Sequence, residues 1–354
     1  MFDPKAMTLV KEVPHTAGFL SGVLDPTTGR FLAGTIDGRI LAYDLPDASA
    51  PAPLGEARKS YVHLLAALPA QKQIVAAGYD CRLVWLDAAT GAQLREADTD
   101  ARPLGMAISP DERRLAIVGD DRLLRLFDAA IGELLATQGG HPDETLKRRP
   151  SSVYSVAFSP DSRLVATGDR TGTILVRDAG TGEVLHTLSA KKFYSDFNKL
   201  PDGTDREGEY ELGGVRGLLF SPDGRTLIAS GMDQYNPNSA GIDGKMGLVG
   251  FDLAGGQTSF ETTLAKGLGY LQCLAWHPAG WLIAAGGGGA QGSGLGTFCA
   301  VELSLMPDGK PGEPVIHELQ MTIRAMALAP ASGHMILAGM LKTAAAGRLE
   351  VWSL

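Results

Sequence analysis

The chain has 354 residues with a formal net charge of −8, and 20% of its residues are charged while 44% are hydrophobic. This composition is typical of a folded globular protein rather than a disordered one, and the acidic balance disfavours nucleic acid as a partner. Three widely spaced cysteines, none in a Cys-x-x-Cys pair, argue against a disulfide framework and against a zinc site.

The first residues, MFDPKAMTLVKEV, lack the basic region and apolar core of a leader peptide. No later stretch approaches the roughly 18 apolar residues that a membrane span needs. We therefore expect a cytoplasmic protein that does not bind membranes. Within this stretch, residues 7–13 read as a short strand that belongs to no neighbouring unit.

From residue 18 onward, one pattern of short strands and turns recurs seven times. A proline marks the first turn of each unit: Pro26, Pro69, Pro110, Pro160, Pro222, Pro278 and Pro330. Their spacing of roughly forty to sixty residues is typical of propeller blades. The first strand of each unit precedes the proline, at residues 18–24, 63–68, 104–109, 153–159, 215–221, 271–277 and 323–329.

Second strands follow the prolines and are rich in Ala and Gly, which indicates burial on both faces near an axis. They are expected at residues 30–35, 73–78, 114–119, 163–168, 226–231, 281–286 and 334–339. Third strands are expected at residues 39–45, 81–87, 122–128, 173–178, 246–253, 297–303 and 348–354. A tight Asp/Gly turn then leads to a more polar fourth strand. No stretch sustains the spacing of apolar residues that a helix requires.

This pattern predicts an all-β fold, a seven-bladed propeller of four-stranded antiparallel blades that forms a single domain over residues 1–354. The expected blades cover residues 18–58, 61–99, 102–138, 152–189, 214–264, 270–319 and 321–354. The last unit ends on a third strand, so we expect residues 7–13 to supply its outer strand and close the ring.

The repeats resemble those of the WD-repeat propeller family over essentially the whole chain. The resemblance rests on Ser-Pro-Asp at 109–111, 159–161 and 221–223, on the aromatic-Asp pairs at 43–44, 127–128 and 251–252, and on Trp352. It implies a scaffold that mediates protein–protein interaction, although a fold does not by itself fix a function.

The chain also departs from the family pattern. Leu86, Arg177 and Val301 stand where the family has tryptophan, and Gly140–His141 precedes an insertion that is expected to displace it. The family's hydrogen-bond network of His, Ser/Thr, Trp and Asp is therefore expected to be broken in most blades. We interpret Arg177 as drift within this network rather than as a functional arginine.

Long connections gather on one face of the predicted ring, around blades 4 to 7. They are residues 141–151, 190–214, 232–245, 287–296 and 340–347. Irregular loops of this length are usually either functional or disordered. Because five of them lie on one face, we predict that this face is the binding surface; the alternative is that the loops are tolerated without a function. On the opposite face, the one long connection expected is residues 306–313.

Exposed aromatic and basic residues in these loops favour a protein or peptide partner. The predicted contact residues are Arg148, Arg149, Lys191, Lys192, Phe193, Tyr194, Phe197, Tyr235, Asn236 and Lys342. The competing interpretation of Phe193 and Phe197 is that they fold back and cap the propeller.

Other chemistry finds weak support. The oxygen-rich residues of 232–245 lack the spacing of a calcium loop, and the glycine tract at 286–296 lacks that of a phosphate loop. No catalytic motif is present; His141, Asp143 and Glu144 are the least poor candidates. We therefore predict a monomeric, non-catalytic scaffold without cofactor or metal. The alternative is an enzyme or small-ligand binder that uses the channel mouth on the same face.

Overall fold

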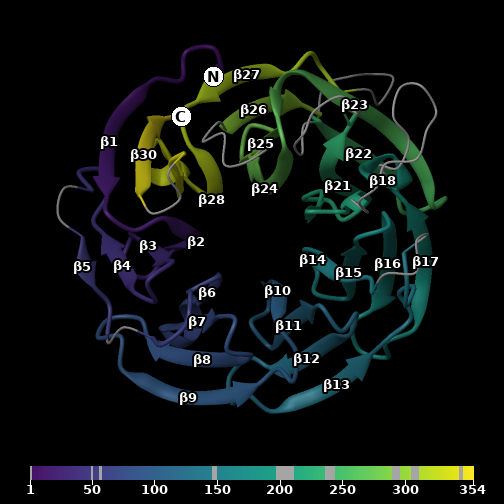
Figure 1. Cartoon of the computed structure of the whole chain (residues 1–354), viewed down its shortest axis with the longest axis horizontal. Coiled ribbons are helices and arrows are strands. Elements are labelled where there is room, and N and C mark those ends of the chain that lie inside the picture. The colour runs from purple at the N-terminus through teal and green to yellow at the C-terminus, as the bar shows by residue number, and fades with distance from the viewer. Residues whose placement is uncertain are drawn as a thin grey trace, which may run out of the picture.

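The structure is a computed structural model, which describes residues 2–48, 51–55, 58–145, 150–196, 211–235, 244–288, 296–303, 311–342 and 346–354. Seven antiparallel sheets of four strands each stand in a ring around a central axis (Figure 1). The predicted seven-bladed propeller is thus confirmed. Among the described residues, the only helical segments are three short turns, and no helix has the length and apolar character needed to cross a bilayer.

In the first six blades the four strands run outward from the axis in chain order, whereas the outer strand of the seventh blade comes from the amino-terminal segment. The innermost strands are β2 (Phe19–Asp25), β6 (Leu64–Leu68), β10 (Pro103–Ile108), β14 (Val153–Phe158), β20 (Gly217–Phe220), β24 (Tyr270–His277) and β28 (Thr322–Ala329). The second strands are β3 (Arg30–Thr35), β7 (Gln73–Ala77), β11 (Arg114–Gly119), β15 (Leu164–Asp169), β21 (Thr226–Asp233), β25 (Trp281–Gly287) and β29 (His334–Met340).

The outer half of each blade is completed in the same way. The third strands are β4 (Ile40–Tyr43), β8 (Arg82–Asp87), β12 (Leu124–Asp128), β16 (Thr173–Asp178), β22 (Lys245–Asp252), β26 (Gly296–Glu302) and β30 (Gly347–Ser353). The outer strands are β5 (Ala52–Pro53), β9 (Gln93–Asp98), β13 (Leu134–Gln138), β17 (Val184–Ser189), β23 (Gln257–Leu268), β27 (Val315–Leu319) and β1 (Leu9–His15). The short turns are η1 (Pro69–Gln71), η2 (Lys191–Phe193) and η3 (Pro330–Ser332).

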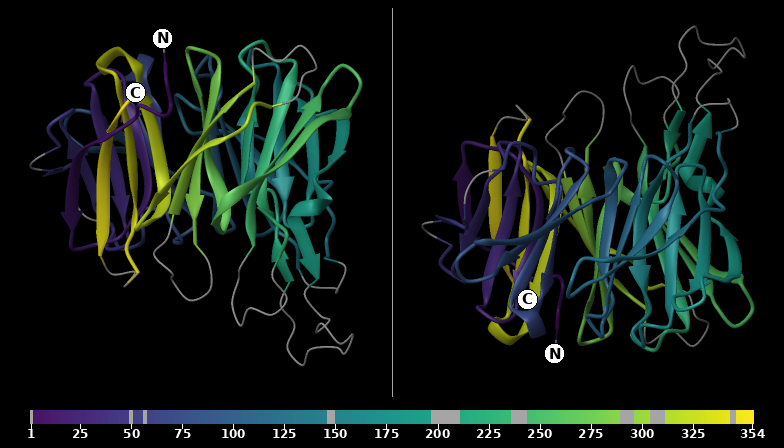
Figure 2. Two further views of the ribbon diagram at one scale, coloured as in Figure 1. Left: turned by 90° about the horizontal axis from the view of Figure 1, so that it is seen from above. Right: turned by 90° about the horizontal axis from the view of Figure 1, so that it is seen from below.

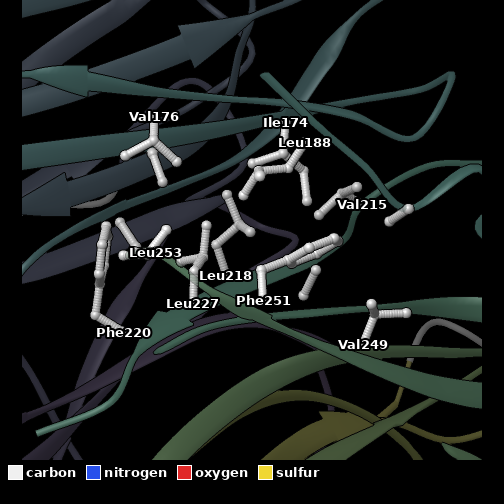
Figure 3. Close-up of a cluster of buried hydrophobic side chains, with 14 of the residues drawn as sticks. Ile174, Val176, Leu188, Val215, Leu218, Phe220, Leu227, Val249, Phe251 and Leu253 are labelled. Atoms are coloured by element: carbon white, nitrogen blue, oxygen red, sulfur yellow. The ribbon is translucent and has the colours of Figure 1, made fainter. Parts of the chain in front are cut away.

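Apolar side chains fill the spaces between adjacent blades. The second and third strands are buried on both faces, as their continuous apolar runs predict, whereas the outer strands alternate between exposed and partly buried residues. Figure 3 shows the cluster between blades 4 and 5, where Ile174 and Val176 of β16 face Phe251 and Leu227 of the next blade. The core is therefore a series of inter-blade layers rather than one central mass.

The Ser-Pro-Asp turns are held by the same three bonds in blades 3, 4 and 5. In blade 4, the Ser159 hydroxyl donates to the Asp161 carboxylate at 2.6 Å and accepts the backbone N–H of Leu164 at 2.9 Å. The backbone N–H of Arg163 donates to the same carboxylate at 3.1 Å. The bond from Ser159 is the main cause that lowers the pKa of Asp161. These repeated turns fix the register between the first and second strands of each blade.

The ring closes as predicted, with β1 of the amino-terminal segment paired antiparallel to β30. The strand begins two residues later than expected, at Leu9, and its residue Glu12 lies opposite Glu350. Arg348 joins the two strands by contacting Glu12 at 3.1 Å and Glu350 at 3.6 Å. The two chain ends consequently lie near each other (Figures 1 and 2).

Blade 4 corrects one expectation, because its Gly-His pair is not displaced. His141 is buried, and its ring nitrogens are hydrogen-bonded with Asp169 at 3.1 Å and Thr167 at 2.8 Å. Asp169 also accepts the backbone N–H groups of Thr171 and Thr173 at 2.8 Å each. Three members of the family's network thus survive in this blade, and only the tryptophan position has changed.

Arg177 occupies that tryptophan position and is itself 5% exposed. Its guanidinium donates to the carbonyl of Gly182 at 3.1 Å and to the carbonyl of Gly139. These bonds join the turn after β16 to the segment that leads to His141, so the arginine is used inside the fold. Burial lowers the pKa of this guanidinium.

Candidate functional site

The face of the ring that carries the long connections is called here the loop-bearing face. It is formed by the turns between second and third strands and by the links between blades. In the 190–214 link, the sequence predicted an irregular loop. The structure places η2 there, followed by a small two-stranded sheet of β18 (Tyr194–Asp196) and β19 (Glu211–Gly213).

Phe193 is not a surface residue, so its predicted role as a contact for a partner is wrong. Its side chain is 0% exposed and packs into the cluster between blades 4 and 5. Space for the ring comes from Gly231 and Gly247, where an added Cβ would lie 2.7 Å from it. The Tyr235 hydroxyl donates to the Phe193 carbonyl at 2.8 Å and fixes the turn. For Phe193, the capping interpretation therefore holds.

The other predicted contact residues have different surroundings. Lys192 lies between two carboxylates, with its Nζ 3.1 Å from Asp233 and 3.2 Å from Glu261. Lys191 and Lys342 are exposed, whereas Tyr194 is half-buried in β18. The remaining predicted residues lie outside the described residues; they are Arg148, Arg149, Phe197 and Asn236.

The innermost strands surround a cavity of about 330 Å³ on the axis of the ring. Each blade contributes the residue that stands six positions before its turn proline, within three residues of the start of the innermost strand. These seven residues form the mouth ring: Leu20, His63, Leu104, Tyr154, Arg216, Gln272 and Arg324.

A second, deeper ring follows two residues further along, because alternate residues of a strand face the same side. It consists almost entirely of apolar residues and glycine: Gly22, Leu65, Met106, Val156, Leu218, Leu274 and Met326. The cavity thus has a polar mouth on the loop-bearing face and an apolar wall below it.

Aromatic rings hold Arg216 in place at the mouth. Its guanidinium carbon lies 3.7 Å from the ring centre of Tyr154 and 4.5 Å from that of Tyr270, and its Nη2 donates to the Gly213 carbonyl at 3.1 Å. A planar cation between two tyrosines is attracted to both ring faces. This arrangement fixes the orientation of Arg216 before any ligand arrives.

A second aromatic group lies on the same face at blades 1 to 3. Tyr61 and Tyr79 are 47% and 42% exposed, and their ring centres are 5.6 Å apart. Tyr79 also contacts the His63 ring, with centres 5.0 Å apart, and the guanidinium of Arg102 at 5.3 Å. The exposed tyrosines are therefore continuous with the mouth ring through His63.

Positive charge dominates the mouth. The pKa of His63 is lowered to about 4, mainly by burial and in addition by the charges of Arg324 and Arg102. The side chain of Arg324 is exposed to solvent in the channel. The surrounding channel walls lower the pKa of its guanidinium, and the charge of Arg216 lowers it in the same direction. The arginines are thus close enough to influence one another.

The catalytic candidates do not form a reactive group. His141 is used in the network of blade 4, and Asp143 forms an exposed ion pair with Arg122 at 3.3 Å. Glu144 pairs with Pro150 in an isolated β-bridge. Burial raises the pKa of the Cys273 thiol, which lines the cavity, to about 12, so it is not a thiolate nucleophile at neutral pH. Within the described ranges, no cluster of His, Cys, Asp and Glu could hold a metal ion.

Sequence reasoning missed the mouth ring, although the repeats contain a signal for it. Aligning the units on their prolines gives one column that holds two arginines, a histidine, a tyrosine and a glutamine among apolar residues. This column differs from the apolar column before it and from the column of mostly small residues after it. It is visible only after the units are aligned, because within a single strand each residue is an ordinary polar substitution.

Comparisons with known proteins agree with this architecture. The sequence model of the family described as "WD domain, G-beta repeat" matches residues 132–178 and 208–235. The chain is 30% identical over 135 residues to the WD repeat-containing protein SL1-17 of Schistosoma mansoni, which is 32% of this chain and 42% of that protein. Over 187 residues it is 26% identical to the WD repeat-containing protein 82 of Drosophila melanogaster, covering 49% of this chain and 55% of the relative.

A longer match joins the chain to the apoptotic protease-activating factor 1 of Rattus norvegicus, with 24% identity over 238 residues, 65% of this chain and 18% of the relative. In each case the chain spans less than two thirds of the relative's length. The matched segment 132–178 contains the surviving His141 network. The seven blades form a β-propeller, and the matched repeats and these relatives show that the sequence is similar to those of WD-repeat proteins.

Proposed function

We propose that this propeller is a non-catalytic platform that binds a protein or peptide partner through its loop-bearing face. WD-repeat propellers generally mediate protein–protein interactions. The observation that supports this role most directly is the exposed pair Tyr61 and Tyr79 beside the arginine-containing mouth ring. Tyrosine and arginine are enriched among the residues that contribute most to binding energy at protein interfaces.

The proposed surface extends from the mouth toward blades 4 to 7. Lys191 and Lys342 are exposed there, and Tyr194 is partly so. Polar and charged side chains are common at the edge of protein interfaces, so these residues suit the periphery of the proposed surface. The high pKa of the Cys273 thiol and the structural use of His141 support a binding role rather than a catalytic one.

The test is affinity capture from a native lysate with the double variant Tyr61→Ala/Tyr79→Ala. Interface tyrosines contribute about 2 kcal/mol or more when they are central, so loss of both should remove the specifically captured proteins. A matched control is Leu135→Ala/Leu185→Ala, which removes two side chains of similar exposure, 52% and 45%, from outer strands. Capture of an unchanged set of proteins by the tyrosine variant would refute the proposed surface.

A second candidate function is binding of a small ligand in the axial cavity. Its volume of about 330 Å³ lies at the lower end of the range for ligand pockets, which is roughly 300–1,000 Å³. Converging polar groups at its mouth favour this alternative. Native mass spectrometry of the purified protein distinguishes the two, because a retained small molecule gives a discrete mass shift that survives the Tyr61→Ala/Tyr79→Ala change.

We further propose that the protein is a monomer in the cytoplasm. The wide spacing of its cysteines suits a reducing compartment, and Cys81, Cys273 and Cys299 are free thiols. Light scattering coupled to gel filtration tests the monomer, and fractionation of cells that express a tagged chain tests the compartment.

A further inference from the structure

Arg216 and Arg324 of the mouth ring have no counter-charge within 4 Å among the described residues, unlike several other arginines of the chain. Arg58, Arg102 and Arg125 each contact an aspartate within 4 Å. No carboxylate among the described residues lies within that distance of Arg216 or Arg324. Arg216 is partly buried and Arg324 is open to the channel, so each presents an uncompensated positive charge to the mouth of the cavity.

The hydrogen-bonding groups of the two arginines are also largely unused. Arg216 donates from Nη2 to the Gly213 carbonyl, and its Nε is buried without a partner, so an outside acceptor would have to use its other N–H groups. Arg324 makes one long contact, from Nη1 to the Gln272 side-chain oxygen at 3.5 Å. Gln272 is itself held by its bond to the Ile323 carbonyl at 2.7 Å, which directs its oxygen toward Arg324. The unused N–H groups could accommodate an acceptor from outside the chain.

The two arginines contribute positive charge to the same cavity. Both line the axial cavity, and the charge of Arg216 lowers the pKa of Arg324. Their mutual repulsion in an enclosed mouth would be relieved by one negative group bound between them. Guanidinium groups bind carboxylate and phosphate oxygens through short, charge-assisted hydrogen bonds. The stacking of Arg216 between Tyr154 and Tyr270 lowers the entropy lost when such a group binds.

We propose that the channel mouth is an oxyanion-binding site, in which Arg216 and Arg324 together bind a carboxylate or phosphate group that enters the axial cavity. The cavity of about 330 Å³ admits a small ligand or a single acidic side chain. The site goes beyond the proposed platform, because it would exist even if the loop-bearing face bound no protein.

The experiment is isothermal titration calorimetry of the full chain at constant ionic strength with three probes. Inorganic phosphate, succinate and the capped peptide acetyl-Ala-Glu-Ala-amide distinguish a phosphate, a free carboxylate and a peptide carboxylate as the source of the oxyanion. We expect saturable 1:1 binding of at least one probe. The variant Arg324→Gln should weaken it roughly 10- to 100-fold, the loss typical of a hydrogen bond to a charged group.

A matched control removes the same charge from the opposite face. Arg163 lies in the turn after the first strand of blade 4, and its side chain is 83% exposed, so Arg163→Gln should leave binding unchanged. The variant Arg216→Lys keeps the charge but loses the planar fork, and should weaken binding less than Arg324→Gln does. Binding of a probe should also raise the pKa of His63, since it offsets the positive charge of Arg324.

Two results would overturn the proposal. One is the absence of saturable binding for all three probes. The other is binding that Arg324→Gln and Arg163→Gln affect equally, which would indicate only a general attraction of anions. The melting temperature of each variant shows that it remains folded, and Arg324→Gln is expected to melt close to the unaltered chain because its contacts within the fold are few.

Discussion

Replacement of Phe193 by alanine tests whether this residue belongs to the core. The side chain is fully buried against two glycines, so truncation leaves a cavity that the rigid strands β21 and β22 cannot fill. Phe-to-Ala changes in such cores cost about 3–5 kcal/mol. With an unfolding entropy of about 2.1 cal/mol/K per residue, a 354-residue chain loses roughly 1.3 °C in Tm for each kcal/mol. We therefore expect Phe193→Ala to lower Tm by about 4–7 °C.

Differential scanning calorimetry provides the measurement, and Lys191→Ala is the control from the same turn. Because Lys191 is exposed, its replacement should change Tm by less than about 1 °C. The variant Gly247→Ala tests the same contact, since the added Cβ would lie 2.7 Å from the Phe193 ring. Combined with Phe193→Ala, it should cost less than the sum of the two single changes, because the cavity accepts the added methyl group. An unchanged Tm for Phe193→Ala would show that the ring is not part of the core.

Two further predictions concern the channel mouth and the closure of the ring. Because the pKa of His63 is about 4 in the folded chain and about 6.5 when unfolded, its contribution to stability is complete above pH 6.5 and is lost as the pH falls toward 4. NMR titration should show this low pKa of His63. The variant Arg324→Gln should raise the pKa but leave it below 6.5, because burial is the larger cause. A His63 pKa near 6.5 in the unaltered chain would contradict the described burial of this residue. Removal of residues 1–14 eliminates most of β1 and should lower Tm by roughly 5–10 °C, whereas Val10→Ala, at a position 51% exposed, should leave it unchanged.

The sequence was sufficient for the architecture because its signals are local and repeated. Prolines after each innermost strand, short apolar runs of five to seven residues and Ser-Pro-Asp turns predict strands without knowledge of the whole fold. Closure by the amino-terminal segment followed from counting strands in the last unit. Each of these inferences depends on residues that are near neighbours in the chain.

The predictions that the structure corrected concern contacts between residues that are distant in the chain. Phe193 and its glycines belong to different elements, so an aromatic residue in a link gave no sign of whether it would be buried. His141 reaches Asp169 across an insertion whose path the sequence does not specify. Whether Lys191, Tyr194 and Lys342 contact a partner stays a prediction.

The antiparallel seam between β1 and β30 also determines how the ring responds to force. Leu9 lies opposite Trp352, so the free ends of both strands meet at the same end of the seam. A pull that separates these two residues loads the first hydrogen-bonded pair alone, then the next, and peels the strands apart. Shearing would instead load all pairs at once. The propeller should therefore open at this seam under low tension while the six continuous blades still resist.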